Sequence, residues 1–250
     1  TIEREFSRRG YEVILCNTGG DRAETLRYLQ AVNQKQVDGI VLVGSVFDTI
    51  CQGAEMEKLL TGVPVVLANG KLDLPNAYSV TVDDKYGVSL AVEHLVARGR
   101  KNIYYIKDRD TDSAKSKRDG FLEAMRRNGL EFADHVLEAG ETLASGMETV
   151  QALLAQGIVP DGIVCGEDLT AAGALKALLR AGLRVPGQVA VVGFNNSDYA
   201  HLCEPVLTSV DNKPEQVALL CVQLLESSIE RSEAYSSVVL QPELAQGETS

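Results

Sequence analysis

Residues 158–212 read IVPDGIVCGEDLTAAGALKALLRAGLRVPGQVAVVGFNNSDYAHLCEPVLTSVDN, and this stretch decides the fold. One apolar run, GIVC, stops at the polar residues 166–168, and a second, VAVVGF, stops at Asn195. A helix pattern that ends at Gly182 lies between the runs, which predicts two parallel strands joined by a crossover helix. Neither run alternates apolar and polar residues, so the sheet is expected to be covered on both faces, as in doubly wound α/β folds.

Polar side chains follow both predicted strands. In open α/β sheets, ligands bind in the crevice beyond the carboxyl ends of the strands. If the chain has a binding site, we therefore expect it near Glu167, Asp168, Asn195 and Asn196.

The composition limits the class of protein. A chain of 250 residues with 45% hydrophobic residues is typical of a globular protein of one large or two ordinary domains. Its net charge of -11 argues against a nucleic-acid surface, because phosphate binding needs clustered Lys and Arg. No apolar run approaches the roughly 20 residues that span a bilayer, so no membrane contact is expected.

The cysteines and histidines give no sign of a metal, a cofactor or a catalytic centre. The five cysteines lack CxxC spacing, and several lie in apolar runs, which favours free thiols in a reducing cytoplasm. The sequence has no GxGxxG, GxxxxGK[ST] or HExxH motif, so no cofactor and no metal are predicted. No nucleophile and base pattern is visible, so no catalytic residue is predicted.

Strand and helix patterns alternate along the rest of the chain. Predicted strands are YEVILC, DGIVLVGS, VPVVLAN, YSVTVD, KNIYYIKD and HVLEAG, and KSKRDGFLEAMRRNG is a predicted helix. Capping-box spacing at Asp21 with Glu24 and at Ser145 with Glu148 predicts two further helix starts. This succession predicts parallel sheets with right-handed crossovers.

Several motifs together resemble the LacI/GalR family of bacterial transcription regulators. GLRVPGQVAVVGFNNSDYA resembles the family's GLRVPxDVxVVGFDDxxxA, and EPVLTSV resembles its TPPLTTV. VPVVLAN, TVDDKYGVSLAVEHLVARGRKNIYYI, SKRDGFLEAM and the closing PEL also match, in the family's order, from about Gly10 to the C-terminus.

The resemblance implies an α/β fold of the periplasmic binding protein-like type I. Such a fold has two doubly wound parallel-sheet lobes, a ligand cleft between them and three interlobe crossovers. The expected lobes are 1–98 plus 212–233 and 99–211 plus 234–250, with SSVVLQPEL in the second. The expected crossings lie near 98–101, 210–213 and 232–236. Residues 1–10 look like the end of a helix, so we expect the family's first strand and its DNA-binding headpiece to lie outside this chain.

The resemblance also implies which residues face a ligand: Ser45, Asn69, Thr111, Ser113, Lys117, Glu167 and Asn195. Lys117 stands where the family usually has Arg. Its neighbour Arg118 is a substitute, although helical geometry turns it about 100 degrees away. Both side chains also fit a solvated helix start.

Asp83 and Asp168 are further candidates with a competing interpretation. Asp83 fits a helix cap or a strand-end partner as well as a ligand contact. Asp168 fits a cap ahead of LTAAGAL better than a direct ligand contact.

Asn195 and Asn69 replace residues that are usually Asp in the family. An amide donates hydrogen bonds, whereas a carboxylate only accepts them. The two replacements also remove two negative charges from a cleft that contains Lys117. We therefore hypothesise a site friendlier to an anionic or carbonyl-rich effector, for which Asn195→Asp weakens the binding of an acid. Glu167, where the family often has Asn, partly offsets this change.

The resemblance implies the effector-sensing and dimerisation domain of a LacI-type regulator. We expect a cytoplasmic homodimer that binds a sugar, a sugar acid or a similar molecule and reaches DNA through a helix-turn-helix headpiece. A periplasmic sugar-binding protein of a transport system is the alternative, because it shares the fold. The cysteines and EPVLTSV favour the regulator. An α/β enzyme would require a convergent acid and base set, which the sequence does not show.

Overall fold

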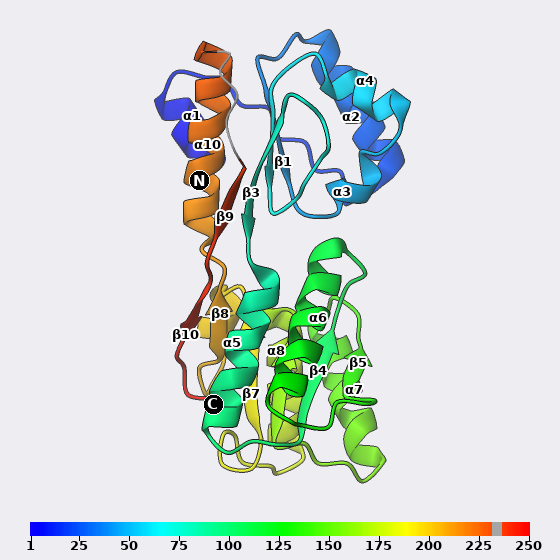
Figure 1. Ribbon diagram of the computed structural model, residues 1–250, viewed down its shortest axis with the longest axis vertical. Helices are drawn as coiled ribbons and strands as arrows, with labels where there is room; N and C mark the ends of the chain where they lie inside the picture. Colours follow the sequence, from blue (N-terminus) through cyan, green and yellow to red (C-terminus); the bar gives the residue numbers. More distant parts are fainter. Residues whose placement is uncertain (232–236) are drawn as a thin grey trace. The chain divides into compact units, whose positions relative to one another are not determined.

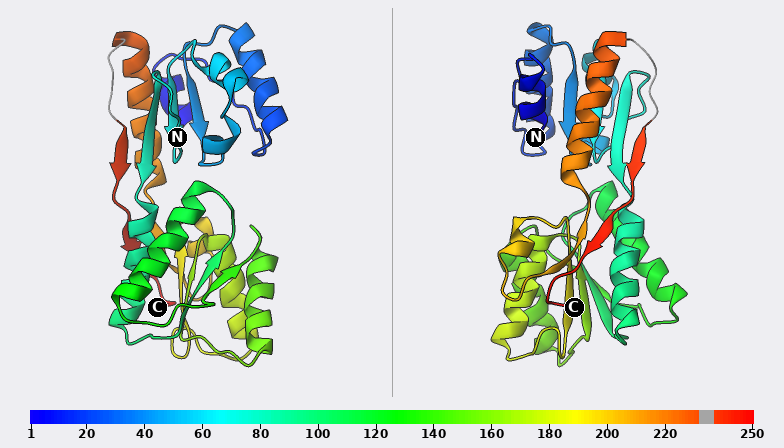
Figure 2. Two further views of the ribbon diagram at one scale, coloured as in Figure 1. Left: turned by 45° about the vertical axis from the view of Figure 1, so that its right-hand side comes forward. Right: turned by 90° about the vertical axis from the view of Figure 1, so that its left-hand side faces the viewer.

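The computed structural model describes residues 1–231 and 237–250. Its internal contacts divide the chain into two compact units. Unit 1 comprises Thr1–Val82 and Lys213–Leu240, and unit 2 comprises Asp83–Asn212 and Gln241–Ser250. Figures 1 and 2 show that each unit is a sheet with helices on both of its faces, which confirms the α/β class.

Unit 1 contains a parallel sheet with the strand order β1-β2-β3-β9. The strands are β1 (Ile40–Val43), β2 (Val65–Ala68), β3 (Ala77–Val82) and β9 (Val238–Leu240). The helices are α1 (Ile2–Arg8), α2 (Arg22–Gln34), α3 (Phe47–Ile50), α4 (Ala54–Leu60) and α10 (Pro214–Arg231). Val65 and Leu67 pack in the core formed with α2, α3 and α4, whereas Val66 packs in the core formed with α1 and α10. Strand β2, Val65–Ala68, is apolar throughout because both of its faces are covered.

Unit 2 contains a sheet with the strand order β10-β8-β7-β6-β4-β5, in which only the β10–β8 pair is antiparallel. The strands are β4 (Ile103–Lys107), β5 (Val136–Glu138), β6 (Gly162–Cys165), β7 (Ala190–Phe194), β8 (Thr208–Asp211) and β10 (Glu243–Ala245). The helices are α5 (Asp84–Ala97), α6 (Asp112–Arg127), α7 (Leu143–Ala155), α8 (Asp168–Arg180) and the short α9 (Asp198–His201). Strands β6 and β7 are parallel and α8 connects them, which confirms the prediction for residues 158–212.

Helix α5 belongs to unit 2, although the expected first lobe, residues 1–98, included it. Val88 and Leu95 of α5 are fully buried in one core with Ile103 of β4 and Val192 of β7. The division therefore falls after Val82 rather than near 98–101. A second division falls between Asn212 and Lys213.

The segment SSVVLQPEL, expected in the second lobe, contributes strands to both units over its described residues 237–244. Val238 to Leu240 pair with β3 of unit 1, whereas β10 pairs with β8 of unit 2. Pro242 lies between the two strands, and a residue without an N–H group interrupts a ladder. The expected crossing at 232–236 lies outside the described residues, and the division falls after Leu240.

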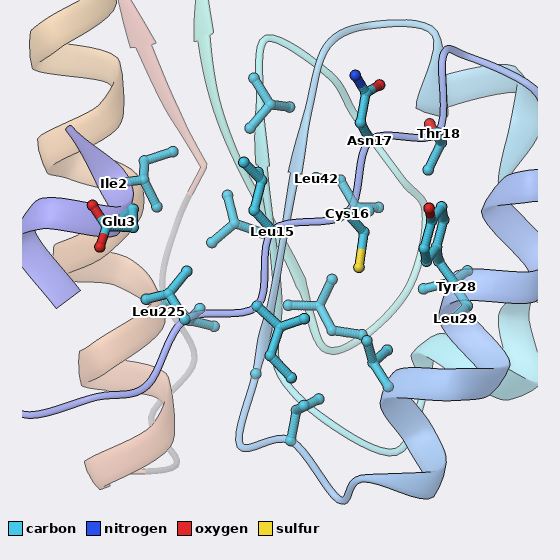
Figure 3. Close-up of a pocket in the computed structure, with 18 of the residues that line it drawn as sticks. Ile2, Glu3, Leu15, Cys16, Asn17, Thr18, Tyr28, Leu29, Leu42 and Leu225 are labelled. Atoms are coloured by element: carbon cyan, nitrogen blue, oxygen red, sulfur yellow. The ribbon is translucent and has the colours of Figure 1, made fainter. Parts of the chain in front are cut away.

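The predicted strand YEVILC, residues 11–16, is wrong. A strand needs a hydrogen-bonded neighbour, and no described strand pairs with this segment or with the other edge of β1. Val13 packs against the core of α1 and α10, while the side chain of Leu15 is exposed. The segment lines an apolar cavity of about 630 Å³ together with residues of α2, β1 and α10 (Figure 3).

The N-terminal caps of α2 and α7 can be compared with the two capping boxes that the sequence predicts. Asp21 caps α2 as expected, since its carboxylate accepts a hydrogen bond from the Glu24 N–H at 2.8 Å. The capping box of α7 is formed by Thr142 and Ser145, three residues before the predicted pair. Thr142 has the extended backbone that a cap requires.

Candidate functional site

The carboxyl ends of three neighbouring parallel strands carry the polar cluster of unit 2. Asp108 follows β4, Glu167 follows β6 and Asn195 follows β7, and these strands lie side by side in the order β7-β6-β4. The turns that hold these side chains therefore meet at one edge of the sheet, where ligands bind in such folds.

Lys117 of α6 is buried within this cluster. Its Nζ donates a hydrogen bond to the Gly166 carbonyl at 2.9 Å and lies 3.9 Å from the centre of the Phe194 ring. Only 7% of the residue is exposed, so the interpretation as a solvated helix start is wrong for Lys117. The side chain of Arg118 is 40% exposed and pairs with Asp119 at 2.8 Å, so it does not replace Lys117 in the cluster.

Three carboxyl groups lie near the lysine: Asp108, which is buried, and Asp84 and Glu167, which are partly buried. Burial raises the pKa of each of them, and the positive charge of Lys117 acts in the opposite direction. Ser113 joins the cluster indirectly, because its hydroxyl donates to Asp84 at 2.5 Å. Asp84 and Asp108 were not predicted from the sequence.

Asn195 connects two parts of the cluster. Its amide group donates a hydrogen bond to the Glu167 carboxylate, and its carbonyl oxygen accepts one from Asn212 at 2.7 Å. The hypothesis of an anion-friendly site relied on the loss of negative charge and on this amide as a hydrogen-bond donor. In the structure the amide is already engaged with a carboxylate of the protein.

Asp168 is fully buried but neither caps α8 nor joins the cluster around Lys117. Its carboxylate accepts hydrogen bonds from the Ser197 N–H at 2.7 Å, the Ser197 hydroxyl at 2.8 Å and the Ser209 hydroxyl at 2.6 Å. These bonds tie the start of α8 to the loop after β7 and to β8. Its role is to hold the strand ends together.

Asp83 and Thr111 are helix caps. The Asp83 carboxylate accepts from the Tyr86 N–H at 2.9 Å and caps α5. The Thr111 hydroxyl accepts from the Ala114 N–H at 3.3 Å and caps α6. They set the direction of the helices that carry Asp84 and Lys117.

Ser45 and Asn69 belong to unit 1, at the carboxyl ends of β1 and β2. The loop after β1 contacts the end of β2, because the Gly44 N–H donates to the Ala68 carbonyl at 2.8 Å. Asn69 has a φ of 55°, and its buried Oδ1 has no hydrogen-bond partner in the described chain. Asn69 therefore holds a free acceptor at a strand end.

The apolar cavity of unit 1 is a separate feature. Figure 3 shows Leu15, Cys16, Leu42 and Leu225 among the side chains that line it, and it contains none of the predicted site residues. Over the described residues, no group of three or more His, Cys, Asp or Glu side chains is arranged to hold a metal ion. Within the same residues, no helix is long and apolar enough to cross a membrane.

Comparison with known proteins identifies the family. Residues 92–250 match the family described as periplasmic binding protein-like domain. An HTH-type transcriptional regulator of Lachnoclostridium phytofermentans is 32% identical over 227 residues, which cover 90% of this chain and 68% of that protein. A LacI transcriptional regulator from a Rhodococcus species superposes with a TM-score of 0.84 at 30% identity, covering 99% of this chain and 90% of that one. The chain belongs to the LacI family of transcriptional regulators.

A further solved structure of a transcriptional regulator contains a sugar. The complex of the transcriptional regulator CelR with cellobiose superposes with a TM-score of 0.88 at 26% identity, covering 100% of this chain and 76% of that one. These relatives are transcriptional regulators. They do not favour the alternative of a periplasmic sugar-binding protein of a transport system.

Proposed function

We propose that this chain is the effector-sensing and dimerisation domain of a LacI-family regulator, and that it binds a sugar or a sugar-like molecule. The observation that carries the proposal is the convergence of Lys117, Glu167 and Asn195 at the strand ends of unit 2. Ser45 and Asn69 of unit 1 are proposed as further contacts.

The cluster has the chemistry that polyols require. Sugar hydroxyl groups both donate and accept hydrogen bonds, so a site for them needs several fixed polar groups. Asp84, Asp108 and Glu167 offer acceptors and Lys117 offers donors. Hydrogen bonds with Ser113, Asn195 and Gly166 hold Asp84, Glu167 and Lys117 in place. The cellobiose complex of CelR, with the same fold, supports a sugar as the effector class.

The proposed mechanism is a shift between conformational states. An effector that binds two states of the domain with different affinities biases a DNA-binding headpiece attached to it, and linkage makes the effect reciprocal. We further propose a cytoplasmic homodimer without enzymatic activity, whose two headpieces read a two-fold operator. The regulator names of the relatives support this assignment.

A thermal-shift screen of the purified chain tests the proposal. Neutral sugars, amino sugars, sugar acids, sugar phosphates and purines are added in turn, because a ligand that binds the folded state raises its melting temperature. We expect a saturable increase with at least one sugar-like compound and no turnover of that compound. A folded sample that responds to none of them, or that converts one to product, contradicts the proposal.

A further inference from the structure

We propose that Asp108, with Tyr105 beside it, forms a subsite that accepts a hydrogen-bond donor of the effector, and that it selects amine- or hydroxyl-bearing ligands against acids. The inference rests on the proposed function and deepens it, because it names the charge class of the effector. The family resemblance did not point to either residue.

Asp108 has an unused acceptor in the interior of unit 2. Its side chain is only 4% exposed, and its buried Oδ2 has no hydrogen-bond partner within the described chain. The hydroxyl group of Tyr105, a fully buried residue, also lacks a partner there. Buried polar groups are usually hydrogen-bonded, so two such atoms in one place indicate a missing partner.

Gly166 shows that these two side chains meet at the strand end of β6. A Cβ atom on Gly166 would lie 2.5 Å from Asp108 Oδ1 and 3.1 Å from the Tyr105 hydroxyl oxygen. The carbonyl of Gly166 accepts the hydrogen bond from Lys117. The subsite is therefore continuous with the cluster that contains Lys117 and Glu167.

The charge balance of the cluster is negative. Asp84, Asp108 and Glu167 face the ammonium group of Lys117, which donates a hydrogen bond to a carbonyl and makes no direct ion pair with them among the described residues. Arg109 also acts on Asp108 and Glu167, but its own charge is shared with Glu141, so the negative charges of the group still outnumber the positive ones. A ligand carboxylate would add a further negative charge at this edge. A ligand ammonium or hydroxyl group would supply the donor that Asp108 lacks.

Arg109 forms an ion pair with Asp108 Oδ2 but does not donate a hydrogen bond to it. Its Nε lies 3.7 Å from Asp108 Oδ2, beyond hydrogen-bond distance, while its Nη2 pairs with Glu141 at 3.2 Å. The side chain of Arg109 is 45% exposed, so it has room to turn toward solvent. A ligand donor reaches Asp108 by displacing Arg109, which keeps its pair with Glu141.

Matched sugars test the inference in the intact chain. The probes are glucose with glucosamine and glucuronate, and galactose with galactosamine and galacturonate, titrated by calorimetry at pH 7. We expect the amino sugar of the responding set to bind at least about tenfold tighter than the acid, with the neutral sugar between them. Asp108→Asn should reduce this ratio by about tenfold.

Asp110→Asn is the control variant. Asp110 lies two residues further along the same loop, and its side chain is 81% exposed, so this change removes the same charge outside the cluster. It should leave the ratio unchanged. An acid that binds as tightly as the amino sugar, or a ratio that Asp108→Asn leaves intact, overturns the inference while the sensor role stands. If a sugar-like compound of the thermal-shift screen binds but no amino sugar among these probes does, the inference fails while the sensor role stands.

Discussion

The side-chain amide of Asn195 donates a hydrogen bond to the carboxylate of Glu167, and this bond joins the ends of β7 and β6. Both residues are partly buried, and the Glu167 carboxyl has a raised pKa because of its burial. This hydrogen bond forms only while one side chain donates and the other accepts.

Asn195→Asp should therefore destabilise the protein. The change places a second carboxylate against Glu167 and removes the donor, which is expected to cost about 2 kcal/mol of unfolding free energy at pH 7. Urea denaturation measures the cost.

The exchanged pair, Asn195→Asp with Glu167→Gln, separates the hydrogen bond from other effects. In the double variant Gln donates and Asp accepts, so it should recover more than half of the stability that Asn195→Asp loses. If the two single losses simply add, the two side chains do not interact as the structure shows.

Lys117→Met should be the most damaging change in the cluster. It removes the buried cation beside three carboxyl groups and its contact with Phe194, with an expected cost of about 3 kcal/mol. Arg118→Met removes the same charge from the neighbouring exposed position and should cost less than about 0.5 kcal/mol. Equal losses for the two variants in chemical denaturation would place Lys117 at the surface.

The stability should depend on pH through Asp108. Burial raises its pKa in the folded protein above the ordinary 3.8, so the folded state binds this proton more tightly than the unfolded state does. Stability from this group is complete below pH 3.8 and is lost as the pH rises through the folded pKa. Asp108→Asn removes the effect.

Melting temperatures of the wild-type protein and of Asp108→Asn at a series of pH values measure this contribution. The difference, wild type minus variant, should fall as the pH rises from 3.8. A difference that increases with pH would mean that the folded protein stabilises the ionised carboxylate instead.

Gly166 leaves no room for a side chain. Because its Cβ would lie 2.5 Å from Asp108 Oδ1, Gly166→Ala should displace that carboxylate, lower the unfolding free energy by about 1 to 3 kcal/mol and weaken sugar binding. Gly187→Ala is the control, since its Cβ would meet Arg184 at an ordinary 3.4 Å. Wild-type stability and binding in Gly166→Ala would show that the space near Asp108 is open.

The sequence predicts the parts of the fold that local patterns determine. The apolar runs of β6 and β7 lack alternation because Ile163 and Val164 face opposite, fully covered sides of the sheet. Residues 11–16 look equally strand-like, but a strand also needs a neighbour to pair with, which local sequence does not reveal. The same limit applies to β9, whose pairing with β3 depends on tertiary structure.

The candidate site was predicted in part. Lys117, Glu167 and Asn195 came from the family resemblance, and the structure brings them together. Asp84 was missed because it follows the cap residue Asp83 and looks like part of a solvated helix start. Asp108 was missed because the run KDRD contains several charges, and only the three-dimensional structure shows that this one is buried.

The measurement that tests the central claim most directly is a calorimetric titration of the sugar-like compound found in the screen against Lys117→Met and Arg118→Met. If the cluster of unit 2 is the effector site, Lys117→Met that is shown to be folded should bind at least about tenfold more weakly than the wild-type protein, and Arg118→Met should bind normally. Unchanged affinity in folded Lys117→Met would contradict the account and place the effector elsewhere on the chain.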